Sequence, residues 1–488
     1  MYRGMWCQFR RAACCMALIA VLTGCGARGQ SRPSPTVGVE RQRPTNIVLI
    51  VADDLGWTDL GSYGSRYYET PNIDRLAREG IRFTAAYANP NCTPTRAALM
   101  TGRYGTRTGV YTVGTGARGL ERFRLMTPVD NVTDLPLEEI TFPEVLRDAG
   151  YATAHVGKWH LGGPGHLPEE QGFGSNVAGN GSGSPRGGYF SPYKNPQLPN
   201  GPEGEYLTDR LAEEAVAFIH QNAQQPFLLY LPFYAVHTPI QAKGDLISKY
   251  EAKSGEAGHG NPAYAAMIDS LDQGVGRVLD ALDELSLNDS TAVFFYSDNG
   301  GVGGYSATGV RARLEVTSNA PLRGGKGMLY EGGVRVPLIA RIPGVTPPGT
   351  TSTVPVMCVD FFPTLLEIAG ANVRSDRPID GVSFHDVLRG MEPDPLARPP
   401  IYWHFPGYLE GVAEEGEWRA TPSGAIRAGN HKLIERFETG GLELYDLEED
   451  IGERNNLADS QPEVVEQLRS QLETWRLSLG AEMPTMKQ

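Results

Sequence analysis

The sequence predicts an α/β fold with a large mixed, mostly parallel sheet sandwiched by helices, followed by a smaller C-terminal α+β subdomain. Three observations predict it: buried strands, helical patterns between them, and a change of pattern late in the chain. The strands are continuous apolar runs of the kind buried on both faces of a parallel sheet. They cover residues 47–51, 152–156, 227–234 and 292–296.

Helical patterns alternate with these strands. They cover residues 72–79, 141–149, 206–220 and 264–287. Gly80 and Gly150 follow two of these patterns directly, as glycines do at helix ends. In a sheet built from such alternation, ligands bind in the crevice beyond the carboxyl ends of the strands.

Each apolar run leads straight into a polar cluster. The clusters are Asp53-Asp54, Lys158-Trp159-His160, His237-Thr238-Pro239 and Asp298-Asn299-Gly300. Because parallel strands end at the same edge of a sheet, we expect the four clusters to converge.

Two segments lack periodicity and are predicted to be long loops, at residues 175–204 and 301–319. Such loops are often binding loops, although a surface excursion is an equally good interpretation of the first. Beyond about Pro399, short strand-like pieces appear at residues 425–427, 432–434 and 442–447, followed by a helical pattern over 462–479. We therefore divide this part of the chain into a main domain, residues 45–398, and a C-terminal subdomain, residues 399–488.

The first 24 residues are typical of an export signal, with arginines before the short apolar stretch 14–22. That stretch ends in Leu22-Thr23-Gly24-Cys25, which resembles the bacterial lipoprotein cleavage box. We therefore expect residues 1–24 to be removed, Cys25 to be lipidated and residues 25–44 to form a tether. The protein would then be exported and membrane-anchored, in the periplasm or at the cell surface, and two or more acyl chains would make the anchor stable. A plain signal peptide that contains a cysteine is the alternative.

The composition of the chain argues against some classes of partner and against a membrane-spanning helix. The chain of 488 residues carries 44 basic and 57 acidic side chains, a net charge of -13. Because nucleic-acid phosphates are bound by surplus Lys and Arg, this balance argues against a nucleic-acid partner. No apolar run reaches the roughly 18 residues that indicate a membrane-spanning helix.

The aspartates of two clusters predict a metal site. Asp53 and Asp54 end one strand, and Asp298 and Asn299 end another. Like charges brought so close together are costly unless a cation neutralises them. An all-oxygen set of ligands suits Ca²⁺ or Mg²⁺ rather than zinc.

Cys92 is predicted to begin a helix. Pro94 lies near the start, Ala97 to Met100 are good helix formers and Gly102 closes the pattern. A helix N-terminus favours anions, so Cys92 could be a reactive thiol as well as a structural one. Of the six cysteines, processing of the N-terminus would leave only Cys92 and Cys358 as free thiols, so a disulfide framework is not expected.

The segment from Cys92 to Arg103 resembles the formylglycine-dependent sulfatases, whose signature is Cys-x-Pro-x-Arg followed by a helix and Thr-Gly-Arg. Cys92, Pro94 and Arg96 match without a gap. Further blocks resemble the family's in the same order: residues 53–56, 157–162, 236–239, 297–300 and 325–333. The family belongs to the alkaline-phosphatase superfamily.

The resemblance implies a site and a mechanism. A maturation enzyme would oxidise Cys92 to formylglycine, whose hydrate attacks the sulfur of a sulfate ester. Ca²⁺, with Mg²⁺ as the alternative, would be held by Asp53, Asp54, Asp298, Asn299 and residue 92. Arg96 and Lys158 would orient the hydrate, and Lys158 and Lys326 would bind sulfate. His237 would lie near the leaving oxygen, with Lys326 as a candidate proton donor, and His160 would take a proton from the second hydroxyl to release sulfate.

The expected substrate is a sulfated carbohydrate, such as one built from galactose or N-acetylgalactosamine units. Export and lipid anchoring suit the use of external polymers. Two alternatives stay open: a phosphate or phosphonate ester hydrolase on the same scaffold, and a non-catalytic glycan-binding lipoprotein. His166, Asn180 and Arg186 are further candidates for substrate contacts because they follow the Lys158 cluster closely.

Overall fold

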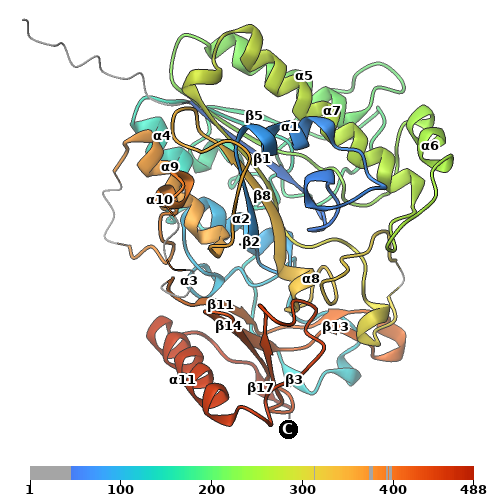
Figure 1. Ribbon diagram of the computed structural model, residues 1–488, viewed down its shortest axis with the longest axis vertical. Helices are drawn as coiled ribbons and strands as arrows, with labels where there is room; N and C mark the ends of the chain where they lie inside the picture. The colour runs from blue at the N-terminus through green and yellow to red at the C-terminus, as the bar shows by residue number, and fades with distance from the viewer. Residues whose placement is uncertain (1–45, 313, 373–376, 392–393, 395–397, 488) are drawn as a thin grey trace, which may run out of the picture. The chain divides into compact units, whose positions relative to one another are not determined.

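The main sheet has nine strands, and four neighbouring ones, β7, β1, β6 and β4, correspond to the four predicted runs. The computed structural model describes residues 46–312, 314–372, 377–391, 394 and 398–487. The strand order is β10-β2-β8-β7-β1-β6-β4-β5, with β9 also paired to β2 (Figure 1). The strands are β1 Asn46–Ala52, β2 Ile81–Tyr87, β4 Ala152–Val156, β5 Ser175–Val177, β6 Phe227–Pro232, β7 Thr291–Ser297, β8 Arg335–Arg341, β9 Thr350–Ser352 and β10 Val356–Met357. The predicted signal peptide, Cys25 and the tether lie outside the described residues.

The sheet is mixed because of one strand. β8 runs antiparallel to both β2 and β7, whereas the other pairings are parallel. The register pairs Ala52 of β1 with Ser297 of β7, and Val51 of β1 with Pro232 of β6. The chain therefore leaves β1, β6 and β7 at the same edge of the sheet, and the polar clusters follow there.

Helices cover both faces of this sheet. Alternate residues of β1 divide between two apolar cores, Ile47, Leu49 and Val51 in one and Val48 and Ile50 in the other. The first core contains side chains of α2, α4, α9 and α10, and the second contains side chains of α1, α5 and α7 (Figure 1). The helices are α1 Pro71–Glu79, α2 Cys92–Thr101, α3 Gly105–Thr108, α4 Phe142–Asp148, α5 Leu207–Asn222, α6 Gly244–Glu251, α7 Pro262–Glu284, α8 Glu331–Val334, α9 Phe361–Ala369, α10 His385–Leu388 and α11 Pro462–Leu479.

The predicted elements differ from the observed ones mainly at their ends. The pattern over 264–287 predicts three residues too many, because Leu287 is buried but lies beyond the last turn of α7. The predicted loop 175–204 begins with the short strand β5, which pairs with β4.

The C-terminal subdomain is an antiparallel sheet with one helix. Its strand order is β11-β14-β15-β16. Val465, Leu468 and Leu472 of α11 form a small apolar core with residues of β14, β15 and β16. The remaining strands form two pairs, β12 with β13 and β3 with β17. Their bounds are β3 Met126–Thr127, β11 Ile401–Phe405, β12 Leu409–Glu410, β13 Trp418–Ala420, β14 Ser423–Ala428, β15 His431–Arg436, β16 Leu442–Asp446 and β17 Thr485–Met486.

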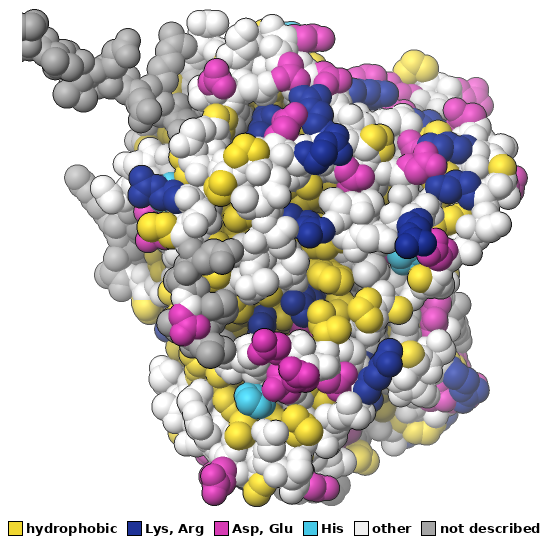
Figure 2. Space-filling view, in the orientation of Figure 1, with side chains coloured by type: hydrophobic (Ala, Val, Ile, Leu, Met, Phe, Trp, Pro, Cys, Tyr) yellow, Lys and Arg dark blue, Asp and Glu magenta, His cyan; other side chains and the backbone are white. Residues whose placement is uncertain are grey.

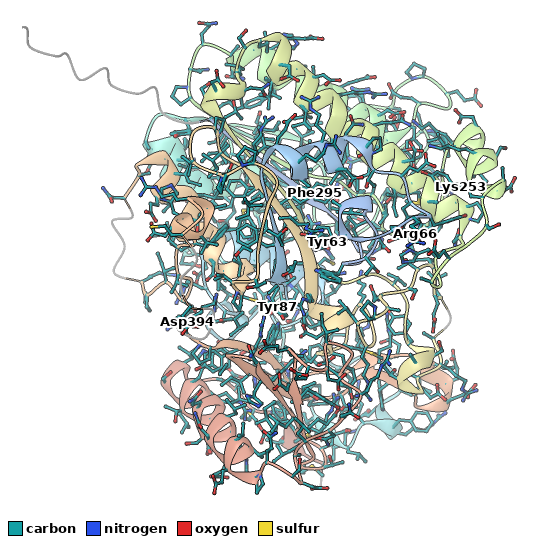
Figure 3. All side chains as sticks on the ribbon, viewed as in Figure 1. Tyr63, Arg66, Tyr87, Lys253, Phe295 and Asp394 are labelled. Carbon is teal, nitrogen blue, oxygen red and sulfur yellow. The ribbon has the colours of Figure 1, made fainter. Side chains whose placement is uncertain are left out.

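Buried charges join this subdomain to the main sheet. Lys432 of β15 forms ion pairs with Glu331 at 2.8 Å and with Glu453 at 3.0 Å, and all three side chains are fully buried. Tyr87 of β2 donates a hydrogen bond to Glu331 and accepts one from Arg427 of β14. Tyr87 therefore lies where the two sheets meet (Figure 3).

The surface carries charges of both signs. On the face shown in Figure 2, Lys and Arg side chains are interspersed with Asp and Glu. Arg75 of α1, for example, forms ion pairs with Asp280 and Asp283 of α7. Among the described residues, no helix is both long and apolar enough to cross a membrane.

Candidate active site

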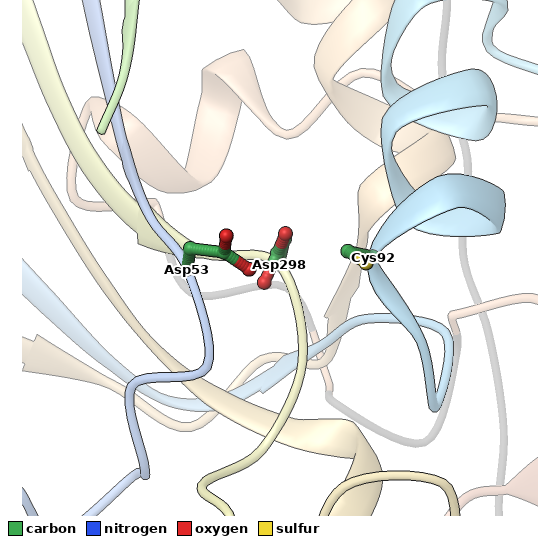
Figure 4. Close-up of side chains that lie close together, drawn as sticks. All are labelled: Asp53, Cys92 and Asp298. Atoms are coloured by element: carbon green, nitrogen blue, oxygen red, sulfur yellow. The ribbon is translucent and has the colours of Figure 1, made fainter. Parts of the chain in front are cut away.

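The polar clusters after β1 and β7 meet at one edge of the main sheet. The side chains of Asp53 and Asp298 extend from neighbouring strands toward Cys92 (Figure 4). The backbone N–H of Asp54 donates to Asp298 Oδ1 at 3.2 Å, which ties the two strand ends together. Asp54 and His160 both have left-handed backbone conformations, with φ of 63° and 59°. Such conformations are unfavourable for residues other than glycine, and they cluster at functional sites.

Cys92 is the first residue of α2, as its sequence pattern predicts. All ten residues of this helix are buried, so the helix end is held firmly by its surroundings. The Cys92 Sγ atom lies 3.4 Å from His160 Nδ1. Thr93 Oγ1 lies 3.3 Å from the same nitrogen. The helix start therefore carries a sulfur atom next to a potential proton acceptor.

Three cations lie against the three aspartates. Lys158 Nζ is 2.6 Å from Asp53 Oδ2, and Lys326 Nζ is 2.6 Å from Asp54 Oδ1. Arg96 Nε and Nη2 donate to Asp298 Oδ2 at 3.0 and 2.8 Å. Arg96 also donates to the backbone carbonyl of Lys158 at 2.7 Å, which positions that lysine. The predicted site residues on these elements are thus brought together in one cluster.

The oxygen atoms of this cluster fit a hard divalent cation. Asp53 Oδ1 and Asn299 Oδ1 are buried and have no hydrogen-bond partner among the described residues. Buried oxygens are rarely left unpaired, because the loss of water costs free energy. Ligand atoms of Asp53, Cys92 and Asp298 lie within 4.8 Å of one another, as do those of Asp53, Asp54 and His237. Carboxylate and amide oxygens suit Ca²⁺ or Mg²⁺.

The pKa values of the three aspartates also indicate that the site needs a cation. Burial and the neighbouring Asp53 carboxylate raise the pKa of Asp298 to about 6. Burial also raises the pKa of Asp53, although Lys158 opposes this effect. Burial disfavours ionised Asp54 as well, but the charge of Lys326 is the largest of the opposing effects that together lower the Asp54 pKa. A divalent cation would stabilise the ionised form of all three carboxylates.

Both histidines of the cluster are neutral in this environment. Burial, followed by the charges of Lys158 and Arg96, places the pKa of His160 well below its ordinary value. Burial lowers the pKa of His237 to about 3, against the opposing effect of Asp54. His237 Nδ1 lies 2.7 Å from the carbonyl oxygen of Thr238, which can only accept, so Nδ1 carries the hydrogen. The other nitrogen of neutral His237, Nε2, is therefore a proton acceptor.

A cavity of about 610 Å³ opens onto these groups. Five predicted residues line it: Asp54, Cys92, His160, His237 and Lys326. The others are almost completely buried: Asp53, Arg96, Lys158, Asp298 and Asn299. The first set borders the cavity, and the second lies in the wall directly behind it.

Other lining residues come from the two predicted loops, from the position of Arg118 and from strands of the C-terminal subdomain. Both predicted loops contribute, with Gly183 and Ser184 from one and Val302, Ala312 and Leu314 from the other. Arg118 lines the cavity too, as do Glu410 and Arg419 of the C-terminal strands β12 and β13. No local signal marks these residues, because only the packing of distant segments brings them to the cavity.

Three weaker candidates lie elsewhere. His166 and Asn180 are both within hydrogen-bond distance of backbone carbonyls, of Leu135 and Ala178 respectively. Neither they nor Arg186 are among the described residues that line the cavity. Nearness in sequence to Lys158 therefore does not by itself place a residue in the wall of this cavity.

Comparisons with known proteins give a consistent result. The family model described as "Sulfatase" matches residues 45–371. A second model, "N-sulphoglucosamine sulphohydrolase, C-terminal", matches residues 325–478. A "Sulfatase" of Formosa agariphila is 38% identical over 517 residues, which cover 90% of each chain.

Two further relatives are informative. The "N-acetylgalactosamine-6-sulfatase" of Canis lupus familiaris is 37% identical over 428 residues, covering 83% of this chain and 74% of that protein. Among solved structures, Ps i-CgsB in complex with k-i-k-neocarrahexaose is 31% identical with a TM-score of 0.71. That match covers 89% of this chain and 93% of the other.

Proposed function

The chain belongs to the sulfatase family and is a sulfuric ester hydrolase, and from this premise we propose that it removes sulfate from carbohydrates built from galactose or N-acetylgalactosamine units. The observation that carries the proposal is the meeting of Cys92, His160 and the oxygen cluster at one cavity. The canine relative's name and the neocarrahexaose bound to Ps i-CgsB support a carbohydrate substrate.

Asp53, Asp54, Asp298 and Asn299 would hold Ca²⁺, with Mg²⁺ as the alternative. When bound, the cation makes a neighbouring hydroxyl more acidic and stabilises negative charge on oxygen. The unpaired oxygens Asp53 Oδ1 and Asn299 Oδ1 support this assignment. Arg96 supports it indirectly, because it holds Asp298 in place through two hydrogen bonds.

Residue 92 would supply the nucleophile. A maturation enzyme oxidises the Cys92 thiol to formylglycine, whose hydrated form carries two hydroxyl groups, and one of them attacks sulfur. Arg96 and Lys158 orient this residue. Lys158 and Lys326 bind the sulfate oxygens, and the position of Lys326 in the cavity wall supports its role.

His237 would lie near the leaving oxygen, with Lys326 as the candidate proton donor, since both line the cavity and lie close to Asp54. His160 would take the proton from the second hydroxyl of residue 92, which breaks the carbon–oxygen bond to sulfate and restores the aldehyde. Its depressed pKa supports this role, because a neutral imidazole can accept a proton.

The test is the mass of the tryptic peptide from Phe83 to Arg96 in protein from the native host, followed by assays on sulfated sugars. We expect an aldehyde or its hydrate at residue 92 and release of inorganic sulfate. An unmodified thiol in active protein would overturn the formylglycine mechanism. A modified protein that releases no sulfate from any sulfated sugar, but does so from an aryl sulfate, would overturn the carbohydrate assignment.

We also propose that Cys25 is lipidated and anchors the exported enzyme to a membrane, in the periplasm or at the cell surface. The sequence Leu22-Thr23-Gly24-Cys25 supports this proposal. Metabolic labelling with a fatty acid should label the wild-type protein and not the Cys25→Ala variant. Equal labelling of both proteins, or of neither, would contradict it.

A further inference from the structure

The wall of the cavity beside Cys92 contains two groups of charged residues. Lys326 and His237 lie beside Asp54 of the oxygen cluster. Arg118, Glu410 and Arg419 are joined by an ion pair and a hydrogen bond, and we call them the second end of the wall. With a volume of about 610 Å³, the cavity is larger than a sulfate group needs and falls in the range of ligand sites. The second end is therefore available to the rest of the substrate.

Arg419 is held rigidly at this end. Its Nε donates to the carbonyl oxygen of Glu410 at 2.9 Å, and its Nη1 donates to Tyr305 Oη at 3.3 Å. The guanidinium also lies over the Tyr305 ring, 5.5 Å from the centroid. A guanidinium has five N–H groups, and these hydrogen bonds occupy two of them. The others remain to bind a ligand without further ordering of the side chain.

Tyr305 also connects Arg419 to the sulfate end. Its hydroxyl donates to the carbonyl oxygen of Lys326 at 3.0 Å while it accepts from Arg419. The same hydroxyl thus joins the backbone of Lys326 to the guanidinium of Arg419. Both residues border the cavity, so this link ties their positions together.

The two arginines at this end differ in how their charge is balanced. Arg118 pairs with Glu410 at 2.6 Å. All contacts of Arg419 described above are with neutral groups, so within the described part of the chain no carboxylate neutralises it. Glu414 also lines the cavity, but it is exposed, and water and salt screen its charge. The wall therefore contains one fixed guanidinium for which no ion pair with a carboxylate is found among the described residues.

We propose that Arg419 binds a second anionic group of the substrate, a sulfate ester or a carboxylate, while the sulfate to be removed lies beside Cys92. The planar fork of arginine matches both groups, which accept two parallel hydrogen bonds. The preferred substrate is therefore a carbohydrate with two anionic groups. This inference rests on the proposed function and adds the substrate class.

The test compares matched pairs of substrates that differ by one anionic group. The first pair is N-acetylgalactosamine 6-sulfate and its 4,6-disulfate, and a second pair differs by a uronate carboxylate on the neighbouring sugar. The measured quantity is the ratio of kcat/KM for the more anionic member to that for the less anionic one. We expect wild-type enzyme to prefer the more anionic member in at least one pair, and the pair identifies the group.

Arg419→Gln should lower that ratio about 10- to 100-fold, the loss expected for a charge-assisted contact. Arg419→Lys should restore part of it, because the charge returns without the fork. Arg311→Gln is the matched control. It removes an exposed arginine that pairs with Glu417 of the neighbouring segment but does not line the cavity, so the ratio should stay at the wild-type value.

Two results would overturn the inference. One is wild-type enzyme that shows no preference in either pair, and the other is an Arg419→Gln variant that lowers kcat/KM equally for both members. The second result would mean that Arg419 acts only through Tyr305 and Lys326. Failure of the proposed function is recognised separately, because wild-type enzyme would then release no sulfate even from 4-nitrophenyl sulfate.

Discussion

At the scale of single residues, Cys92 carries the proposed reaction. Cys92→Ala should lower kcat/KM for sulfate esters by roughly 10³-fold or more, because no other group replaces the nucleophile. Cys358→Ala is the matched control: it is the other buried free cysteine among the described residues, and its loss should leave turnover near the wild-type value. Initial rates of sulfate release decide the point, and a similar loss in both variants would speak against Cys92 as nucleophile.

His155 offers a second residue-scale prediction, this time on stability. It lies in β4 among Trp159, Phe173 and Tyr230, and burial lowers its pKa to about 3. The folded state therefore binds this proton more weakly than the unfolded state, in which the pKa is about 6.5. The neutral ring contributes stability above pH 6.5, and this contribution is lost at about 1.4 kcal/mol per pH unit as the pH falls toward 3.

His155→Phe should abolish that dependence. The measurement is the free energy of unfolding by urea between pH 7 and pH 4, for both proteins. The difference between wild type and variant should change in favour of the variant as the pH falls, whatever its value at pH 7. A constant difference would show that His155 titrates equally in the folded and unfolded states.

At the scale of elements, the segment after β1 depends on Asp59. This buried carboxylate accepts hydrogen bonds from the backbone N–H of Gly56 at 2.9 Å, from Tyr264 of α7 at 2.7 Å and from Thr317 at 2.7 Å. Tyr264 Oη is also 3.4 Å from the carbonyl oxygen of Asp54. Asp59 therefore joins α7 and the loop 301–319 to the segment that carries Asp53 and Asp54, two of the proposed metal ligands.

Asp59→Asn should weaken Ca²⁺ binding roughly 10- to 100-fold, as is usual when a group that orients metal ligands is altered. Calorimetric titration of metal-free protein measures this affinity directly. Asp74→Asn is the control, because Asp74, in the first turn of α1, accepts from the backbone N–H of Ser62 instead. Equal Ca²⁺ affinity in both variants would rule out a positioning role for Asp59.

At the scale of the whole described molecule, the buried cluster around Lys432 holds the C-terminal subdomain to the main sheet. Lys432→Met removes the cation and leaves Glu331 and Glu453 buried close together, with Arg335 still paired to Glu331. The expected loss is about 3–5 kcal/mol in the free energy of unfolding. Arg66→Ala, which breaks an exposed pair with Glu256, should cost about 1 kcal/mol or less. Urea denaturation of both variants tests this contrast, and similar losses would contradict it.

Much of the main domain could be predicted from sequence because its signals are local. The apolar runs that become β1, β4, β6 and β7 are continuous in the chain, and each is followed by its polar cluster. The sequence pattern did not identify β8, which is the antiparallel strand of the sheet. It did not identify β9 and β10 either, which are only a few residues long. Strand direction and edge pairing depend on distant partners, which a local pattern does not encode.

The sequence by itself determined the residues on which the proposed chemistry depends: the cysteine at a helix start, the carboxylate and amide groups at strand ends and the family they indicate. Only the tertiary structure decided what surrounds that chemistry. It brings Arg419 and Glu410 of the C-terminal hairpin to the cavity that contains Cys92, and it leaves His166 away from it. The physical reason is that a cavity wall is made by packing segments far apart in the chain, whereas a strand end or helix start is made by neighbouring residues.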